Sequence, residues 1–201
     1  MHISTLFINI ILISSLILSG CATQETQPDN LSPQDIDKAL KQTSESDISK
    51  YKETLALISS GDLDKAESSL KDFADDQPAL AGPWANLALI SIKRNKLDEA
   101  EKRLQLALAR NPEMPQALNL MGYIEKQRGN IIKARDYYIK AIELKDNYAL
   151  AHYNLALIYD IYIQDVPKAV AHYQKYLALT RYQDKKTAEW LDQLKASLKK
   201  G

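Results

Sequence analysis

The residues with the greatest capacity for covalent or metal chemistry are few: one cysteine, Cys21, and three histidines, His2, His152 and His172. A single cysteine excludes an intrachain disulfide and a cysteine-based metal site. The histidines lack metal-ligand spacing with Asp or Glu, and neither a Gly-x-Ser-x-Gly sequence nor a phosphate-binding glycine loop occurs. We therefore expect no enzyme, no cofactor and no metal. His152 is expected to pack between helices, and His172 to fill space at the surface or between helices.

Cys21 follows a strongly apolar segment. Residues 3–18 are dominated by Ile, Leu and Phe, and Leu18-Ser19-Gly20-Cys21 closes the run. Such a run ended by small residues is typical of a secretory signal. These four residues resemble a bacterial lipobox. The resemblance implies a signal peptide over residues 1–20 and the attachment of fatty acids, including palmitate, to Cys21. The alternative is an uncleaved membrane anchor, because the run is near the ~17-residue lower limit for a span. No Lys or Arg precedes it.

The residues after Cys21 bear on location. Ala22 and Thr23 follow the cysteine, in place of the aspartate that resembles an inner-membrane retention signal. The lipoprotein resemblance therefore implies a lipid anchor in the outer membrane, with the protein facing the periplasm. Residues 21–46 are expected to form a tether, with a short helix starting near Ser32-Pro33. Because the 26 basic residues balance the 26 acidic ones, the chain has no net positive charge that would attract nucleic acid.

From about residue 47 onward the chain repeats with a fixed period, roughly 34 residues long. One segment carries a series of large and small residues: Trp84, Leu87, Ala88, Ala100, Leu104, Ala107 and Pro112. The next segment carries their counterparts one period on: Leu118, Met121, Gly122, Ala134, Tyr138 and Ala141. Another period gives His152, Leu155 and Ala156, and then one extra residue precedes Ala169, Tyr173 and Tyr176. An earlier copy contains Ala66, Leu70, Phe73 and Pro78. A period of this length indicates stacked supersecondary units.

Each segment reads as two amphipathic helices. Trp84, Leu87 and Ala88 fall on one helical face, and small residues at position 88 and its equivalents indicate a close approach of two helices. The pattern resembles the tetratricopeptide repeat, which implies an all-α, right-handed superhelix of about four hairpins at 47–80, 81–114, 115–148 and 149–183. A C-terminal helix from about Lys185 to Lys199, within 184–201, is expected to cap the solenoid.

The family resemblance also implies a concave face lined by fixed positions of each first helix. Carried over to this chain, the candidate groove consists of Leu89, Ile92, Lys93, Asn119, Tyr123, Lys126, Gln127, Tyr153, Asn154, Leu157 and Asp160. Exposed aromatics beside polar groups suit a bound peptide, with Tyr123 and Tyr153 as the expected anchors. The convex face and the flanking helices are the alternative sites. The remaining repeat tyrosines are expected to pack between helices: Tyr138, Tyr159, Tyr173 and Tyr176.

These interpretations predict a lipid-anchored envelope scaffold or adaptor that binds a partner protein or peptide segment near the membrane. Small lipoproteins of this build resemble type IV pilus pilotins, which help a secretin ring to assemble. The alternatives are an accessory component of a TonB/ExbB-type energy-transducing system and an adaptor of a cell-wall enzyme. We expect a monomer or a weak dimer.

Overall fold

The structure is a computed structural model and describes residues 44–198. The predicted signal peptide, the predicted lipidation site Cys21 and most of the predicted tether lie outside these residues. None of the helices in the described part of the chain has the length and hydropathy needed to cross a membrane.

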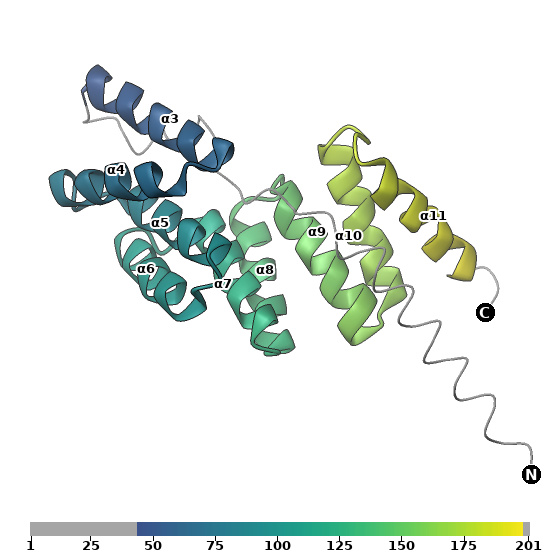
Figure 1. Cartoon of the computed structure of the whole chain (residues 1–201). Helices are drawn as coiled ribbons and strands as arrows, with labels where there is room; N and C mark the ends of the chain where they lie inside the picture. Colours follow the sequence, from purple (N-terminus) through teal and green to yellow (C-terminus); the bar gives the residue numbers. More distant parts are fainter. Residues whose placement is uncertain (1–43, 199–201) are drawn as a thin grey trace, which may run out of the picture.

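Four helical hairpins follow one another along the described chain. They are α3 (Glu45–Ser60) with α4 (Leu63–Asp76), α5 (Ala81–Lys93) with α6 (Leu97–Arg110), and α7 (Pro115–Gln127) with α8 (Ile131–Leu144). In the fourth, α9 (Ala149–Leu157) continues as the π-helix η1 (Ile158–Ile163) and pairs with α10 (Val166–Leu179). The hairpins stack in chain order (Figure 1). The predicted all-α solenoid is confirmed.

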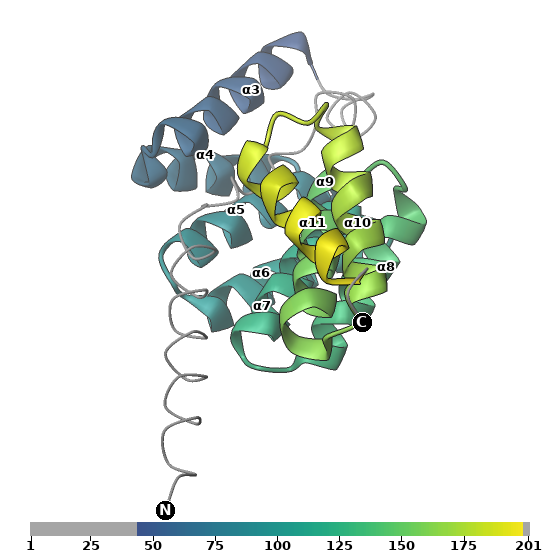
Figure 2. The same cartoon turned by 90° about the vertical axis from the view of Figure 1, so that its right-hand side faces the viewer.

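The last helix, α11 (Lys185–Leu198), packs against α10. In the end-on view it lies in front of the fourth hairpin, at the opposite end of the stack from α3 (Figure 2). Leu191 and Leu194 are its buried apolar residues. Asp184 caps its start by accepting from the Thr187 amide and hydroxyl. The expected capping helix is thus part of the observed fold.

One residue in the left-handed conformation follows the first helix of every hairpin. These residues are Gly61, Asn95, Gly129 and Gln164, with φ of 86°, 57°, 79° and 60°. Glycine and asparagine tolerate this conformation, so the chain can reverse direction within a short turn. The first three occupy the same position in successive repeats, whereas Gln164 comes one position late. The one extra residue of the fourth repeat therefore lies within the first helix of the fourth hairpin.

The π-helix accounts for the single break in the repeat period. A π turn closes hydrogen bonds one residue further along than an α turn, so it accommodates one extra residue without ending the helix. The turn after η1 is closed by the Asp165 amide, which donates to the Tyr159 carbonyl at 2.8 Å. Ala169 and Tyr173 then resume the buried repeat positions.

Close contact between paired helices depends on the small residues of the repeat. Ala88 and Ala156 are completely buried, and a Cβ added to Gly122 would lie 2.7 Å from the Tyr138 ring. Tyr138, Tyr159 and Tyr173 are buried, as expected from their repeat positions, and Tyr176 is half-buried. The packing role predicted for these positions is confirmed.

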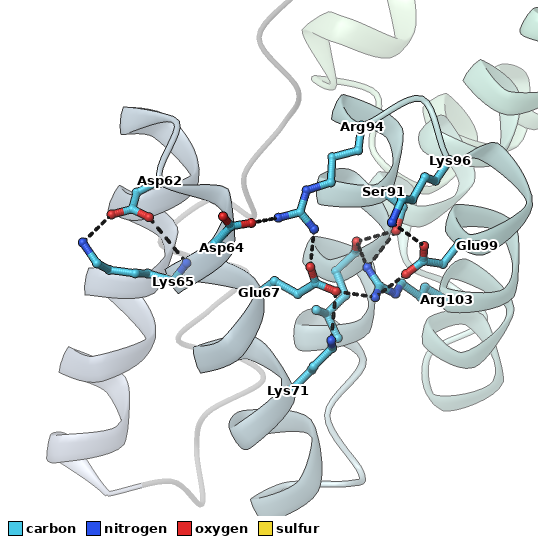
Figure 3. A network of polar contacts seen from close by, with 11 residues as sticks. Asp62, Asp64, Lys65, Glu67, Lys71, Ser91, Arg94, Lys96, Glu99 and Arg103 are labelled. Carbon is cyan, nitrogen blue, oxygen red and sulfur yellow. Dashed lines mark hydrogen bonds and ion pairs between the residues drawn. The ribbon is translucent and has the colours of Figure 1, made fainter.

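Ion pairs join neighbouring hairpins at their turns. Glu67 of α4 accepts from Arg103 of α6 at 2.7 Å and from Arg94 at the end of α5, which also pairs with Asp64 (Figure 3). The next junction repeats this arrangement at the equivalent positions, where Arg128 contacts Asp98 at 2.6 Å and Glu101 at 2.8 Å. The junction between the third and fourth hairpins lacks this ion cluster. The residues equivalent to Asp98, Glu101 and Arg128 are Ile132, Arg135 and Tyr162 there.

Candidate partner-binding face

The candidate residues lie on the first helices of the hairpins, on a surface that we call the first-helix face. It is formed by α5, α7 and α9 with its continuation η1. Seven of the predicted residues keep solvent contact: Lys93 and Gln127 are exposed, and the half-buried ones are Ile92, Tyr123, Lys126, Leu157 and Asp160. The other four are buried: Leu89, Asn119, Tyr153 and Asn154.

The buried asparagines tie first helices to each other. Asn154 Nδ2 donates to Asn119 Oδ1 at 3.0 Å, which joins α9 to α7. In the same manner Asn86 Nδ2 donates to the Tyr51 hydroxyl at 2.8 Å, which joins α5 to α3. Burying such groups is costly unless they are hydrogen-bonded, and these pairs provide the partners. The structure therefore places Asn119 and Asn154 in the interior, where they set the spacing of the stacked helices.

Tyr153 requires a correction. It was expected to be an exposed aromatic anchor, but its side chain is only 8% exposed. Two tyrosines of α10 cover it, with ring centres 6.0 Å away for Tyr173 and 4.9 Å away for Tyr176. Edge-on and tilted aromatic contacts at these distances are favourable. Tyr153 is part of the fourth hairpin's core, and Leu89 is likewise completely buried in α5.

Tyr123 and Lys126 form a half-buried pair of an aromatic ring and a cation on the face. The Lys126 ammonium lies 5.2 Å from the centre of the Tyr123 ring, one turn away on α7. Burial lowers the pKa of Lys126 below its usual value. Among residues 44–198, no carboxylate lies within ion-pair distance of this ammonium, although most other cations near the turns are paired. The pair thus combines a desolvated cation with an aromatic surface.

Asp160 serves the capping helix. Its carboxylate accepts from the Trp190 indole at 2.7 Å and from the Tyr173 hydroxyl at 3.1 Å. These contacts connect η1 to α11 and α10 at once. Although the predicted groove includes Asp160, the observed contacts direct it toward the C-terminal end of the solenoid.

A histidine pair inside the fourth hairpin was not anticipated. His152 Nδ1 lies 3.0 Å from His172 Nδ1, and His152 Nε2 lies 2.9 Å from the Asp146 carbonyl. Because a carbonyl only accepts, His152 Nε2 carries the proton and the His172 Nδ1–H donates to His152 Nδ1. Burial, with the neighbouring His152, lowers the pKa of His172 to about 4. The predicted packing role of His152 is confirmed, since it is 4% exposed.

No group of three or more metal-binding side chains occurs between residues 44 and 198. Sequence reasoning found the accessible residues of the first-helix face but not the histidine pair, the asparagine pair or the ion clusters. The ion clusters had a usable signal, because Asp64, Glu67 and Arg94 recur one repeat later as Asp98, Glu101 and Arg128.

Comparison with protein families identifies the repeats. Sequence profiles of the tetratricopeptide repeat match residues 57–123 and residues 115–148. The protein O-mannosyl-transferase TMTC3 is 35% identical over 77 residues in Mus musculus and 34% identical over 77 residues in Homo sapiens. These matches cover 38% of this chain but only 8% of those proteins. The chain contains tetratricopeptide repeats, which are generally non-catalytic scaffolds for protein–protein interaction.

Solved structures show the same fold. A structure of Pseudomonas aeruginosa PilF matches with a TM-score of 0.64 and 19% identity, over 81% of this chain and 72% of that one. The protein TTC0263 of Thermus thermophilus matches with a TM-score of 0.63 and 16% identity, over 93% of this chain and 94% of that one. The first repeat domain of Spaghetti (RPAP3), solved bound to an HSP90 peptide, matches with a TM-score of 0.53 and 17% identity, over 59% and 92%. At these identities the likeness concerns the fold alone.

Proposed function

We propose that this tetratricopeptide repeat protein is a lipid-anchored scaffold of the bacterial envelope, which binds a segment of a partner protein on its first-helix face. The lipid on Cys21 would confine the complex to the periplasmic side of the outer membrane. Confinement to a thin layer raises the effective concentration of two membrane-associated partners without any new contact between them.

The observation that carries this proposal is the run of accessible side chains along adjacent first helices. Ile92 and Lys93 at the end of α5 are matched in the next repeat by Lys126 and Gln127 at the end of α7. Tyr123 lies one turn before them. An extended segment crossing α5 and α7 would therefore meet apolar, aromatic and charged groups on rigid helices, which lowers the entropic cost of binding.

The proposed cellular role is the assembly of an envelope complex such as a pilus or secretin system. The lipobox-like sequence and the fold likeness to PilF support this choice. Accessory roles in a TonB/ExbB-type system, or as adaptor of a cell-wall enzyme, are the alternatives. These roles differ in the partner protein and not in the face that binds it. Identifying the bound partner therefore distinguishes them.

Site-specific crosslinking in intact cells tests the face. A photoreactive amino acid at Gln127 on α7 should give a discrete adduct with an envelope protein. The same group at Lys102, an exposed residue of the second helix α6, is the matched control. Adducts at Lys102 but not at Gln127 would reject the first-helix face in favour of the convex surface.

Fractionation of Cys21→Ala cells tests the anchor. We expect the wild-type protein in the outer-membrane fraction. The Cys21→Ala variant should be absent from that fraction and should lose the crosslink formed at Gln127. An unchanged distribution of the variant would contradict lipidation at Cys21.

Light scattering of the purified protein over a range of concentrations should report a monomer or a weak dimer, and a constant higher mass would contradict that expectation.

A further inference from the structure

The fourth hairpin has a titratable contact where the third hairpin has an apolar one. Its helices α9 and α10 meet through His152 and His172, whose Nδ1 atoms lie 3.0 Å apart. One repeat earlier, with the inserted residue allowed for, the equivalent residues are Leu118 and Tyr137. These two belong to one hydrophobic cluster, in which Leu118 is buried. Pairing of the two helices therefore does not require histidine, and the histidine pair adds a dependence on pH that an apolar contact lacks.

The contact between the two rings depends on their protonation. His152 Nε2–H donates to the Asp146 carbonyl at 2.9 Å, which leaves His152 Nδ1 to accept from the His172 Nδ1–H. One added proton would keep this hydrogen bond but would place a positive charge on a pair that is buried at His152 and half-buried at His172. A second proton would put N–H groups on both Nδ1 atoms, which lie too close together to hold two protons between them.

The neighbouring charges do not offset an added proton. Among the described residues, the charged side chains that act on the pair are Asp146 and Lys175, and α8, which also packs on α9, adds none. Lys175 contacts the Asp146 carboxylate at 2.7 Å, so the two together carry no net charge. Lys175 also lowers the pKa of Asp146, which keeps this carboxyl ionised while the histidines titrate.

The π-helix covers the other side of the pair with a neutral ring. Tyr159 of η1 stacks on His172 with ring centres 5.8 Å apart. The ammonium of Lys168, which is itself ion-paired, lies 5.3 Å from the centre of the same tyrosine ring. This side therefore supplies no carboxylate that would stabilise a protonated pair.

Burial lowers the pKa of both histidines. For His172, burial together with the neighbouring His152 lowers the pKa to about 4, and for His152 burial is again the main cause. Because these values lie below the ordinary value of 6.5, the unfolded chain binds more protons than the folded chain as the pH falls. The stability that the neutral pair contributes is therefore complete above pH 6.5 and is lost between pH 6.5 and about 4.

The contact lies in the terminal unit of the stack. Tyr173, the residue after His172 on α10, donates to Asp160, which also accepts from Trp190 of α11. A change in the position of α10 would therefore release the capping helix as well. In a repeat protein the terminal unit can open while the other units stay folded, because it has one interface fewer.

We propose that the histidine pair makes the C-terminal end of the solenoid acid-sensitive, so that protonation of His152 and His172 opens the fourth hairpin and α11 while the first three hairpins stay folded. This acid response goes beyond the proposed function and does not depend on it. Where the first-helix face binds a partner, the opening would remove Leu157 and Asp160 from that face, so pH would control how much of it is available.

Hydrogen exchange of the full-length protein in detergent micelles tests the proposal. Exchange is compared at pH 7 and pH 5 after correction for the intrinsic rate at each pH. We expect protection to fall about tenfold in α9, α10 and α11 and to stay unchanged in α5 to α8. Most carboxyl groups take up protons near pH 4, below this window.

The repeat itself supplies the matched control. The double variant His152→Leu/His172→Tyr recreates the Leu118–Tyr137 combination of the third hairpin. It should keep the same protection in α9 to α11 at both pH values. A titration of the wild-type protein by NMR gives a second measurement that needs no variant to fold, and the His172 resonance should titrate well below pH 6.5.

Three results would overturn the proposal. The first is equal protection of α9 to α11 at pH 7 and pH 5 in the wild-type protein, or an equal loss in the double variant. The second is a loss of protection that extends through α5 to α8, which would show that the end does not open separately. The third is a His172 pKa at or above 6.5, because the pair would then hold its proton in the folded state. All three leave the crosslink at Gln127, and with it the proposed function, unaffected.

Discussion

Gly122 and Tyr138 show how one residue pair sets the distance between two helices. The equivalent pair in the second hairpin is Ala88 with Leu104, both completely buried. A tyrosine in place of the leucine fills the space that the alanine methyl group would need, so the third hairpin has glycine there. In the third hairpin the two positions are therefore physically coupled.

We predict that Gly122→Ala lowers the free energy of unfolding by roughly 1–3 kcal/mol, because the new methyl group overlaps the Tyr138 ring. In a Tyr138→Leu background, which recreates the Ala88–Leu104 combination, the same change should cost less than about 1 kcal/mol. Urea denaturation of the four proteins measures the coupling. Equal costs in both backgrounds would show that the close contact does not limit the packing.

Removing either of two buried tyrosine hydroxyls should change the stability of the protein in different ways. Tyr51 accepts from Asn86 Nδ2 at 2.8 Å, whereas the Tyr138 hydroxyl has no partner among residues 44–198. Tyr51→Phe should therefore cost roughly 1–3 kcal/mol, since it leaves the Asn86 amide unsatisfied. Tyr138→Phe should leave thermal stability unchanged or raise it. A clear loss of stability in Tyr138→Phe would reveal a hydrogen bond, for example to a buried water.

At the level of the helices, Glu67 connects the first two hairpins. Burial alone would raise the pKa of this carboxyl, but hydrogen bonds from Arg103, Arg94 and Lys71 lower it to about 2 (Figure 3). Arg103 also donates to the Leu87 carbonyl at 2.9 Å and to the Ser91 hydroxyl at 2.7 Å. A single carboxylate thus holds α4 against both α5 and α6.

We predict that Glu67→Gln destabilises the protein by roughly 1–3 kcal/mol at neutral pH, after solvent screening is allowed for. Because the folded-state pKa is below the unfolded value of 4.5, the charged Glu67 stabilises the fold fully above pH 4.5. The difference between wild type and variant should therefore shrink as the pH falls from about 4.5 to about 2. Denaturation over this range measures it, with Glu143→Gln, an exposed position, as control.

Asp160 has a comparable role at the other end of the solenoid. We predict that Asp160→Ala, which removes the acceptor of Trp190 and Tyr173, costs roughly 1–3 kcal/mol and loosens α11. Hydrogen exchange should quicken in α11 more than in α5 to α8. Asp192→Ala, an exposed position of α11, should change neither quantity. Unchanged exchange in Asp160→Ala would mean that Leu191 and Leu194 hold the helix without this contact.

At the scale of the molecule, the principal helix contacts between residues 44 and 198 lie within hairpins and between neighbouring hairpins. Such solenoids gain stability from each repeat and each interface, and their terminal units have one interface fewer. We predict that amide exchange is fastest in α3 and α11 and slowest in α5 to α8. Mass spectrometry of deuterated protein measures this profile. Uniform protection from α3 to α11 would indicate an all-or-none unit in place of a stack.

Periodicity was sufficient to predict the helices, their pairing and the inserted residue. Buried small and large residues recur at the same positions of each repeat, and the packing that they specify is local to one hairpin and its neighbours. The family resemblance, carried over position by position, identified Tyr123, Lys126 and Gln127, which keep solvent contact in the folded chain.

The tertiary structure decided which polar side chains meet, even where, as for Glu67, the residue recurs one repeat later. Glu67 and Arg103 are 36 residues apart, Asn119 and Asn154 are 35 apart, and His152 and His172 are 20 apart. Their hydrogen bonds depend on side-chain directions after stacking, which periodicity does not specify. Tyr153 is buried for the same reason, because its exposure depends on where the α10 rings lie and not on its own position in the repeat.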